Sequence, residues 1–225
     1  MKIIVLVLSS NNTKYNILNE TIKKTCFSEN DNDIEIFYYY GNSDKLYQEN
    51  ENIYCPVEET VSNIGRKTVS VFEWVLNNKT FDYIFRTNES SYIDLYNLKK
   101  FIENKPRTNF YCANPIFVNG LWVGAGVYFL SKDVVEMVSK YKQNIHHELP
   151  DDVALGFLMH DLKISLFEMT KETLGTWDNI DFFNLTEDKI DFTQFYYRCR
   201  CHDRMDDIRI MKKLHEMIKR KHTHE

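Results

Sequence analysis

The chain has 225 residues, of which 43% are hydrophobic and 27% are charged, and these values are ordinary for a soluble globular protein. The length predicts one domain, residues 1–225, that is large enough to bury a substantial core. The net charge of −5 argues against general attraction to nucleic acid or to an anionic membrane, so locally placed cations would have to meet any phosphate ligand.

In the first half of the chain, apolar strand patterns alternate with helical ones. The strand patterns are short apolar runs that end in polar or glycine-containing loops, and the helical patterns repeat every three to four residues. In chain order, the predicted elements are a strand over Ile3–Leu8, a helix over Tyr15–Cys26, strands over Ile34–Tyr40 and around Ile53–Val57, a helix over Thr60–Leu76 and a central strand over Phe81–Phe85. This alternation predicts an α/β fold with a mostly parallel central sheet and helices on both faces.

The second half of the chain is less regular. Pro150 favours a helix start because proline fits the first turn, and the acids that follow it complement the helix dipole. In chain order, we expect strands over Phe110–Ala113 and Leu121–Leu130, a helix over Lys132–Lys142, a helix over Pro150–His160, a strand over Ile164–Phe167, a loop over Asp178–Phe195 and a closing helix over Met205–Ile218. We interpret this half as an irregular acceptor-binding part.

Polar side chains follow the predicted central strand abruptly, from Arg86 through Asn88 and Glu89 to Ser90. In open α/β sheets, ligands bind in the crevice at the carboxyl ends of the strands. An Asn/Ser turn that only ends the strand explains the same residues equally well. The stretch is therefore a candidate ligand site, with a simple turn as the alternative.

Four patches of the sequence, in order, resemble glycosyltransferases of the GT-A fold, most closely the β1,3-galactosyltransferase type (glycosyltransferase family 31) and its compact viral or bacterial relatives. The ordered set is more specific than any single patch. The patches are Asn63–Thr68, which resembles an N-L-T-x-K-T segment, Arg86–Leu98, which follows a K-T-D-D-D-V-F-V run, Gly124–Tyr128 with Ser131–Asp133, which resembles G-G-G-Y-V-L-S, and Asp151–Gly156, which resembles E-D-V-x-x-G.

The resemblance implies a GT-A enzyme that transfers a monosaccharide, with inversion, from a nucleotide-sugar donor to a glycan or glycoprotein acceptor, and UDP is the favoured nucleotide. In the family, D-x-D carboxylates hold a manganese ion that bridges the donor diphosphate. Here Asn88, Glu89 and Ser90 replace the three aspartates. Because hard dications prefer carboxylate oxygens, Glu89 alone makes a poor metal ligand set, and manganese use is left open.

The same resemblance assigns roles at the acceptor side. Asp152 is the predicted general base, with Asp151 as runner-up, and acids that only complement the helix dipole are the alternative. Trp122 could stack on a sugar or pack in the core. Gly124, Ala125 and Gly126 are predicted to let a sugar approach the backbone, and a β-bulge is the alternative.

Donor binding is assigned to cations and to polar loop residues. Arg198 and Arg200 alternate on a predicted extended segment and are candidates for gripping the diphosphate, with a surface ion-pair network as the alternative. Arg66 and Lys67 could reach the phosphates or only decorate a helix. The remaining predicted donor residues are Ser9, Ser10 and Asn11 for the nucleoside, which helix capping also explains, and Arg86, Asn88, Glu89 and Ser90 beyond the central strand.

Two other functions compete with this prediction. A catalytically silent relative would bind a nucleotide or glycan without transfer, but the retained Asp151 and Asp152 favour the enzyme. A nucleotidyltransferase would need paired metal-binding carboxylates at the central strand, which this chain lacks.

The predicted location is the cytoplasm, or a viral factory if the protein is viral. The five scattered cysteines favour a reducing compartment, and Cys199, Cys201 and His202 lack a second ligand pair for zinc. The amino-terminal apolar run is too short for a secretory signal or a membrane anchor.

Overall fold

The computed structural model describes residues 1–28, 31–169, 172–174, 185–199 and 201–223, and the chain separates into two compact units. Unit 1 consists of Met1–Ser10, Asp31–Asn88 and Lys105–Met169. Unit 2 consists of Asn11–Asn30, Glu89–Asn104 and Thr170–Glu225. A single domain over residues 1–225 stays a prediction, and each unit is described by itself.

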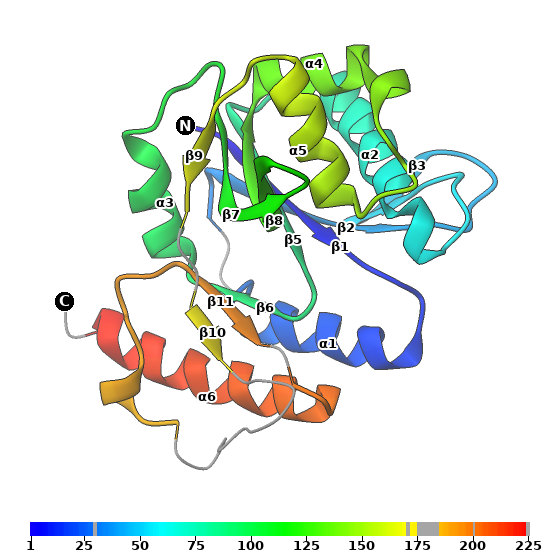
Figure 1. Ribbon diagram of the computed structural model, residues 1–225. Coiled ribbons are helices and arrows are strands. Elements are labelled where there is room, and N and C mark those ends of the chain that lie inside the picture. Colours follow the sequence, from blue (N-terminus) through cyan, green and yellow to red (C-terminus); the bar gives the residue numbers. More distant parts are fainter. Residues whose placement is uncertain (29–30, 170–171, 175–184, 200, 224–225) are drawn as a thin grey trace. The chain divides into compact units, whose positions relative to one another are not determined.

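Unit 1 is built on an eight-stranded sheet with the order β3-β4-β2-β1-β5-β8-β7-β9 (Figure 1). β1 pairs in parallel with both β2 and β5, β2 pairs in parallel with β4, and β8 runs antiparallel to β5. The strands are β1 (Ile3–Leu8), β2 (Ile34–Tyr40), β3 (Tyr47–Glu49), β4 (Asn52–Tyr54), β5 (Tyr83–Asn88), β7 (Tyr111–Val118), β8 (Leu121–Ser131) and β9 (Leu166–Glu168). The mostly parallel α/β sheet predicted from the alternating pattern is confirmed.

Three helices of unit 1 pack over the core of this sheet: α2 (Ile64–Asn78), α4 (Lys132–Lys140) and α5 (Asp151–Asp161). α2 contacts both α4 and α5, and α5 lies on β8. The buried residues Val71, Phe72 and Val75 of α2 recur at helical spacing, so they form one apolar stripe facing the sheet. Short 3₁₀ turns, η1 (Val61–Asn63) and η2 (Lys142–Asn144), precede α2 and follow α4.

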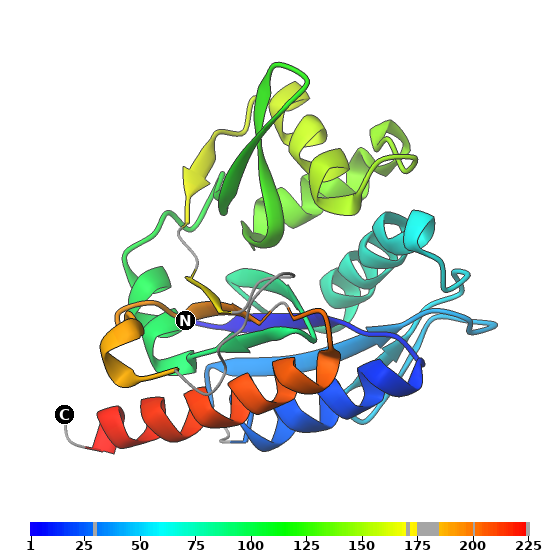
Figure 2. The same ribbon diagram turned by 60° about the horizontal axis from the view of Figure 1, so that its bottom comes forward.

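Unit 2 contains a three-stranded sheet with the order β10-β11-β6, formed by β10 (Glu172–Leu174), β11 (Tyr196–Cys199) and β6 (Ser91–Ile93). Its helices are α1 (Thr13–Lys24), α3 (Leu95–Glu103) and α6 (Arg204–Thr223), with a 3₁₀ turn, η4, over Glu187–Lys189. α6 lies beside α1 along their lengths (Figure 2). Within the described part of the chain, no helix has the length and apolar character needed to cross a membrane.

Several element boundaries differ from the sequence prediction by a few residues, and β5 continues through the polar residues Arg86 to Asn88. Two of the differences lie beside a proline. β7 was expected to end at Ala113, yet it continues through Pro115 to Val118. β9 pairs with β7 only over Tyr111–Ala113, so beyond that point Pro115 lies on an open edge where its missing N–H costs no ladder bond.

The strand expected around Ile53–Val57 is β4, which contains Ile53, pairs in parallel with β2 and ends at Tyr54, because Pro56 has no N–H for a ladder bond. β3 pairs with it in the antiparallel direction.

Close packing of α5 on β8 depends on Gly156. A Cβ atom added to Gly156 would lie only 2.4 Å from Cβ of Val123, which is fully buried in β8. A glycine within a helix costs about 1 kcal/mol relative to alanine, so its presence here indicates that close approach outweighs helix propensity.

We expect Gly156→Ala to destabilise the protein by about 1–3 kcal/mol, because the steric overlap exceeds the gain in helix propensity. Urea denaturation, monitored by circular dichroism, measures the change in the free energy of unfolding. His160→Ala, at an exposed position of the same helix, is the matched control and should stay within about 0.5 kcal/mol of wild type. Equal stability of Gly156→Ala and wild type would contradict this packing argument.

Candidate functional site

The buried side chain of Arg86, near the carboxyl end of β5, joins three other elements of unit 1. Its Nη2 donates to Oδ2 of Asp151 at 2.7 Å, at the start of α5. Its Nη1 donates to the carbonyl oxygen of Gly126 in β8 at 2.7 Å, and its Nε donates to the hydroxyl of Tyr39 in β2 at 3.2 Å. This guanidinium therefore links the carboxyl end of β2, the middle of β8 and the start of α5 to β5.

The electrostatics of this pair favour a charged Arg86. Burial is the largest single effect and lowers the pKa of Arg86, but Asp151, Tyr39 and Tyr128 together more than offset it, so the pKa lies above its ordinary value. Burial raises the pKa of Asp151, and Arg86 opposes this rise. The Asp151 side chain is only 12% exposed. Asp151 is thus held inside an ion pair.

Asp152, the next residue, is half-buried and is held by backbone groups. Its Oδ2 accepts from the N–H of Gly126 at 2.6 Å, and its Oδ1 accepts from the N–H of Val153 at 2.9 Å. Gly126 thus offers its N–H to Asp152 and its carbonyl to Arg86. The two acids suggested by the sequence differ in their partners, since Asp151 binds a cation and Asp152 binds amides.

Backbone conformation and close packing within the protein explain both glycines of the Gly124–Gly126 patch. The register between β7 and β8 shifts between Ala113 and Asn114, and beside this β-bulge Gly126 has φ +76°, a conformation that favours glycine. A Cβ on Gly124 would lie 2.3 Å from the hydroxyl of Tyr111. The β-bulge left open as an alternative is therefore present, and a sugar near Gly124, Ala125 or Gly126 stays a prediction.

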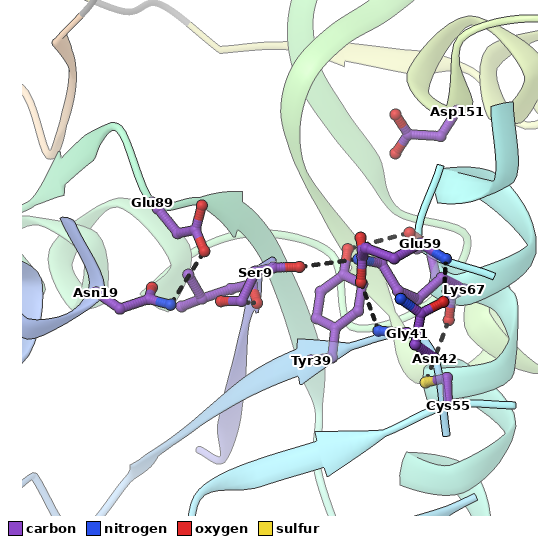
Figure 3. Close-up of polar contacts among 12 residues, drawn as sticks. Ser9, Asn19, Tyr39, Gly41, Asn42, Cys55, Glu59, Lys67, Glu89 and Asp151 are labelled. Atoms are coloured by element: carbon purple, nitrogen blue, oxygen red, sulfur yellow. Dashed lines mark hydrogen bonds and ion pairs between the residues drawn. The ribbon is translucent and has the colours of Figure 1, made fainter. Parts of the chain in front are cut away.

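Lys67 is buried in α2 and ties together the loops that follow β1 and β2 (Figure 3). Its Nζ donates to the carbonyl oxygen of Ser9 at 2.8 Å and to Oε1 of Glu59 at 2.5 Å. Oε2 of Glu59 accepts from the N–H of Gly41 at 2.6 Å. Lys67 is engaged within the protein, so a direct contact with a phosphate stays a prediction.

The other predicted residues of unit 1 lie in different settings. Asn88 is the last residue of β5 and lies opposite Leu8 in the register with β1. Arg66 is exposed in the first turn of α2, and Ser10 is half-buried beyond β1. Trp122 is 64% exposed, so it is not a core residue, and its ring lies 5.3 Å from that of Phe117.

The motif that replaces D-x-D is divided between the units, because the second segment of unit 1 ends at Asn88 and the second segment of unit 2 begins at Glu89. In unit 2, Glu89 is buried and its Oε1 accepts from Nδ2 of Asn19 at 3.0 Å (Figure 3). The carbonyl oxygen of Ser90 accepts from Nη1 of Arg198 at 2.9 Å, and Nη1 also donates to Oγ of Ser90. Asn11, also in unit 2, is exposed ahead of α1, and Arg200 lies outside the described residues.

A manganese centre of the D-x-D kind does not fit these residues. Glu89 supplies one carboxylate, which is buried and already hydrogen-bonded, and its neighbours Asn88 and Ser90 are neutral. Across the described ranges of the chain, no group of three or more His, Cys, Asp or Glu side chains is arranged to hold a metal ion. The donor set lacks what a hard dication requires.

Sequence reasoning missed several partners in these networks. Tyr39 and Glu59 belong to segments that show no chemical motif, and the sequence pattern around Tyr111 indicates only a strand. In unit 2, His222 lies in the last turn of α6 and belongs to no motif. Its Nε2 donates to the buried carboxylate of Asp94 at 2.8 Å, beside a cavity of about 320 Å³. These contacts join residues far apart in the sequence, so no local pattern signals them.

Comparison with known proteins supports the fold. No family model matches the sequence. The mouse protein UDP-GalNAc:beta-1,3-N-acetylgalactosaminyltransferase 2 is 24% identical over 58% of this chain, and the match spans only 32% of that protein.

Among solved structures, a glycosyltransferase involved in the glycosylation of the major capsid of PBCV-1 covers 95% of this chain and 100% of its own, with 14% identity and a TM-score of 0.54. The chain therefore has a GT-A-like glycosyltransferase fold, as the resemblance implied.

We expect Arg86→Met to cost about 3–5 kcal/mol, because it leaves the buried carboxylate of Asp151 and the carbonyl of Gly126 without their cation. Urea unfolding of Arg86→Met, Asp151→Asn and the double variant measures the loss in the free energy of unfolding. The double variant should cost less than the sum of the single ones by at least about 1 kcal/mol.

Arg107→Met is the control for this cycle. Arg107 pairs with Asp82 at 2.9 Å, but its side chain is 56% exposed, so its loss should cost no more than about 1 kcal/mol. If the losses in unfolding free energy of Arg86→Met and Asp151→Asn simply add in the double variant, the two residues are not energetically coupled.

Proposed function

We propose that this protein is an inverting glycosyltransferase that moves a monosaccharide from a UDP-sugar donor to a glycan or glycoprotein acceptor. The observation that carries the proposal is the junction in unit 1 where Arg86, Gly126 and the pair Asp151–Asp152 meet. These residues come from three of the four resemblance patches. The fourth patch is adjacent, since a Cβ on Gly65 would lie 3.7 Å from Cβ of Asp151.

Asp152 is the general base in this proposal. Transfer requires removal of the proton from the acceptor hydroxyl as its oxygen attacks the anomeric carbon of the donor. The N–H groups of Gly126 and Val153 orient the Asp152 carboxylate, whereas Asp151 is occupied by Arg86. The proton passes to Asp152, the new C–O bond forms, and the bond to the diphosphate breaks with its electron pair left on UDP.

Inversion follows from this assignment. A single base on the acceptor side, with no enzyme nucleophile, allows one displacement on the face of the sugar opposite the leaving group. A retaining reaction through a covalent intermediate would need a second side chain in contact with the anomeric carbon.

The remaining roles are proposed residue by residue. Ser9, Ser10 and Asn11 contact the nucleoside, and the bond from Lys67 to the Ser9 carbonyl supports a positioning role for Lys67. Arg66, exposed in the first turn of α2, faces phosphate, and exposed Trp122 stacks on the acceptor sugar. The match to a mouse N-acetylgalactosaminyltransferase and the GT-A-like fold support a UDP donor.

Replacing the base should separate catalysis from binding. We expect Asp152→Asn to lower the rate of UDP release from the donor by about 10²–10⁴-fold, with UDP affinity within about twofold of wild type, since the amide keeps an acceptor oxygen for Gly126. A coupled assay for released UDP, run with and without glycan acceptors, measures the rate. Asp161→Asn, on an exposed carboxylate of the same helix, is the control and should retain full activity.

Undiminished turnover by Asp152→Asn would remove Asp152 as the base. Tight UDP binding by the wild type, with neither transfer nor donor hydrolysis, would instead identify a catalytically silent nucleotide-binding module.

The nucleotide preference is tested by thermal shift. We expect UDP and UDP-sugars to raise the melting temperature more than ADP, GDP and CDP at equal concentration, because only a ligand bound to the folded state stabilises it, by about 2.7 kcal/mol at 100 times its dissociation constant. Equal shifts for all four diphosphates would contradict a UDP-specific nucleoside pocket.

A further inference from the structure

The β7–β8 hairpin of unit 1 exposes two aromatic side chains that contact each other. Phe117 is 61% exposed and Trp122 is 64% exposed, and the two residues lie opposite each other in the register of the strands. The centres of their rings are 5.3 Å apart. Single exposed apolar residues are ordinary on a protein surface, but adjoining aromatic rings form a patch of the kind that binding sites use. We refer to these two residues as the aromatic pair.

A tight turn holds the aromatic pair in place. Val118 and Leu121 pair across a loop of two residues. The loop residues, Asn119 and Gly120, have φ angles of +49° and +86°. Positive φ at both positions is what a type I′ turn requires, and the twist of this turn matches that of the strands it joins. The rings are therefore presented on a short, regular hairpin, so a ligand that binds them does not have to order a long loop.

Strand β8 connects the aromatic pair to the proposed base. β8 lies beside α5 (Figure 1). The N–H of Gly126 in β8 donates to Asp152 at 2.6 Å. Trp122 is four residues before Gly126 in the same strand, which corresponds to about 13 Å of extended chain. This separation exceeds the size of one sugar ring, so a ligand that reaches from Asp152 to the aromatic pair needs more than one sugar residue.

The composition of the hairpin favours an uncharged ligand. Residues 108–131, which contain all of β7 and β8, include no Asp, Glu, Lys, Arg or His. Acidic glycans, phosphorylated peptides and anionic lipid head groups are bound chiefly through charged hydrogen bonds, which the side chains of this segment cannot supply.

The open edge of β7 is a poor template for a strand of another protein. β9 pairs with β7 only over Tyr111–Ala113, and Pro115, beyond that point, has no N–H to donate. A neutral sugar has the chemistry that complements the aromatic pair. The C–H groups on the faces of its rings pack against aromatic side chains, while its hydroxyl groups stay in water.

We propose that Phe117 and Trp122 form an acceptor subsite that binds an uncharged oligosaccharide at sugar residues beyond the one that receives the new bond. The inference rests on the proposed function and deepens it, because Asp152 is taken to lie at the reacting end of the acceptor. It adds Phe117 to the site and predicts that oligosaccharides bind better than the corresponding monosaccharides.

Substitution by leucine separates stacking from hydrophobic anchoring. Leucine keeps an apolar side chain on the strand but removes the ring face, so Phe117→Leu and Trp122→Leu retain an apolar anchor and lose a platform for sugar. Phe167→Leu, at a 40% exposed position of β9 in the same unit, is the matched control.

The full chain of each variant is applied to an array of neutral and acidic glycans that range from monosaccharides to hexasaccharides, and the glycans bound by wild type are then titrated by nuclear magnetic resonance. We expect wild type to bind a neutral oligosaccharide more tightly than the monosaccharide at its reacting end. Phe117→Leu and Trp122→Leu should each weaken oligosaccharide binding by about three- to tenfold. Monosaccharide binding should stay within about twofold of wild type, as for distant sites, and Phe167→Leu should bind both ligands like wild type.

The inference is overturned if wild type binds no neutral oligosaccharide, if both leucine variants of the aromatic pair bind it as wild type does, or if they weaken monosaccharide and oligosaccharide binding equally. Binding of wild type and both variants to vesicles of uncharged phosphatidylcholine, with no glycan bound, identifies a membrane anchor instead. Should Trp122→Leu fail to fold, as judged by circular dichroism, Phe117→Leu and Trp122→Phe, which keeps a smaller ring, decide.

This inference and the proposed function fail in different ways. Oligosaccharide binding through the aromatic pair, without transfer or donor hydrolysis, would leave the subsite standing and remove the proposed function. Transfer to a glycan at rates that neither Phe117→Leu nor Trp122→Leu changes would do the reverse.

Discussion

One buried cation, Arg86, organises the part of unit 1 on which the proposed chemistry depends. Its planar guanidinium meets a carboxylate, a backbone carbonyl and a phenol from three different elements. A buried charge without such partners destabilises a fold, so only arrangements that supply all three are favourable. Because Gly126 binds Arg86 through its carbonyl and Asp152 through its N–H, the position of the proposed base depends on the same cation.

The sequence was sufficient to predict the architecture of unit 1 because its strands are dominated by local patterns. Ile3–Leu8 and Phe81–Phe85 are apolar runs bounded by turn residues, and they lie side by side as the parallel strands β1 and β5. Pro150 and the two acids after it predict a helix start, and α5 begins at Asp151. The residues that start helices and end strands act locally, so these boundaries can be predicted without knowledge of tertiary contacts.

The partners within the site could not be predicted in the same way. Arg86 and Asp151 are 65 positions apart, and Lys67 binds the carbonyl of a residue 58 positions away. A lysine in a helix is ordinarily predicted to be exposed, whereas Lys67 is buried because it pairs with Glu59. Arg198 was identified as a candidate cation, but its attachment to Ser90, across 108 positions, required the structure.

Neither unit is a continuous piece of chain, since each is assembled from three separate segments. α1 (Thr13–Lys24) belongs to the same unit as α6 (Arg204–Thr223), and the two helices are in contact. On a ribosome that adds about 5–20 residues per second, α1 therefore waits roughly ten seconds or more before its partner exists. During that interval its apolar face, with Leu18 and Ile22, is not covered by α6, so unit 2 is completed later in synthesis than unit 1, whose last segment ends at Met169.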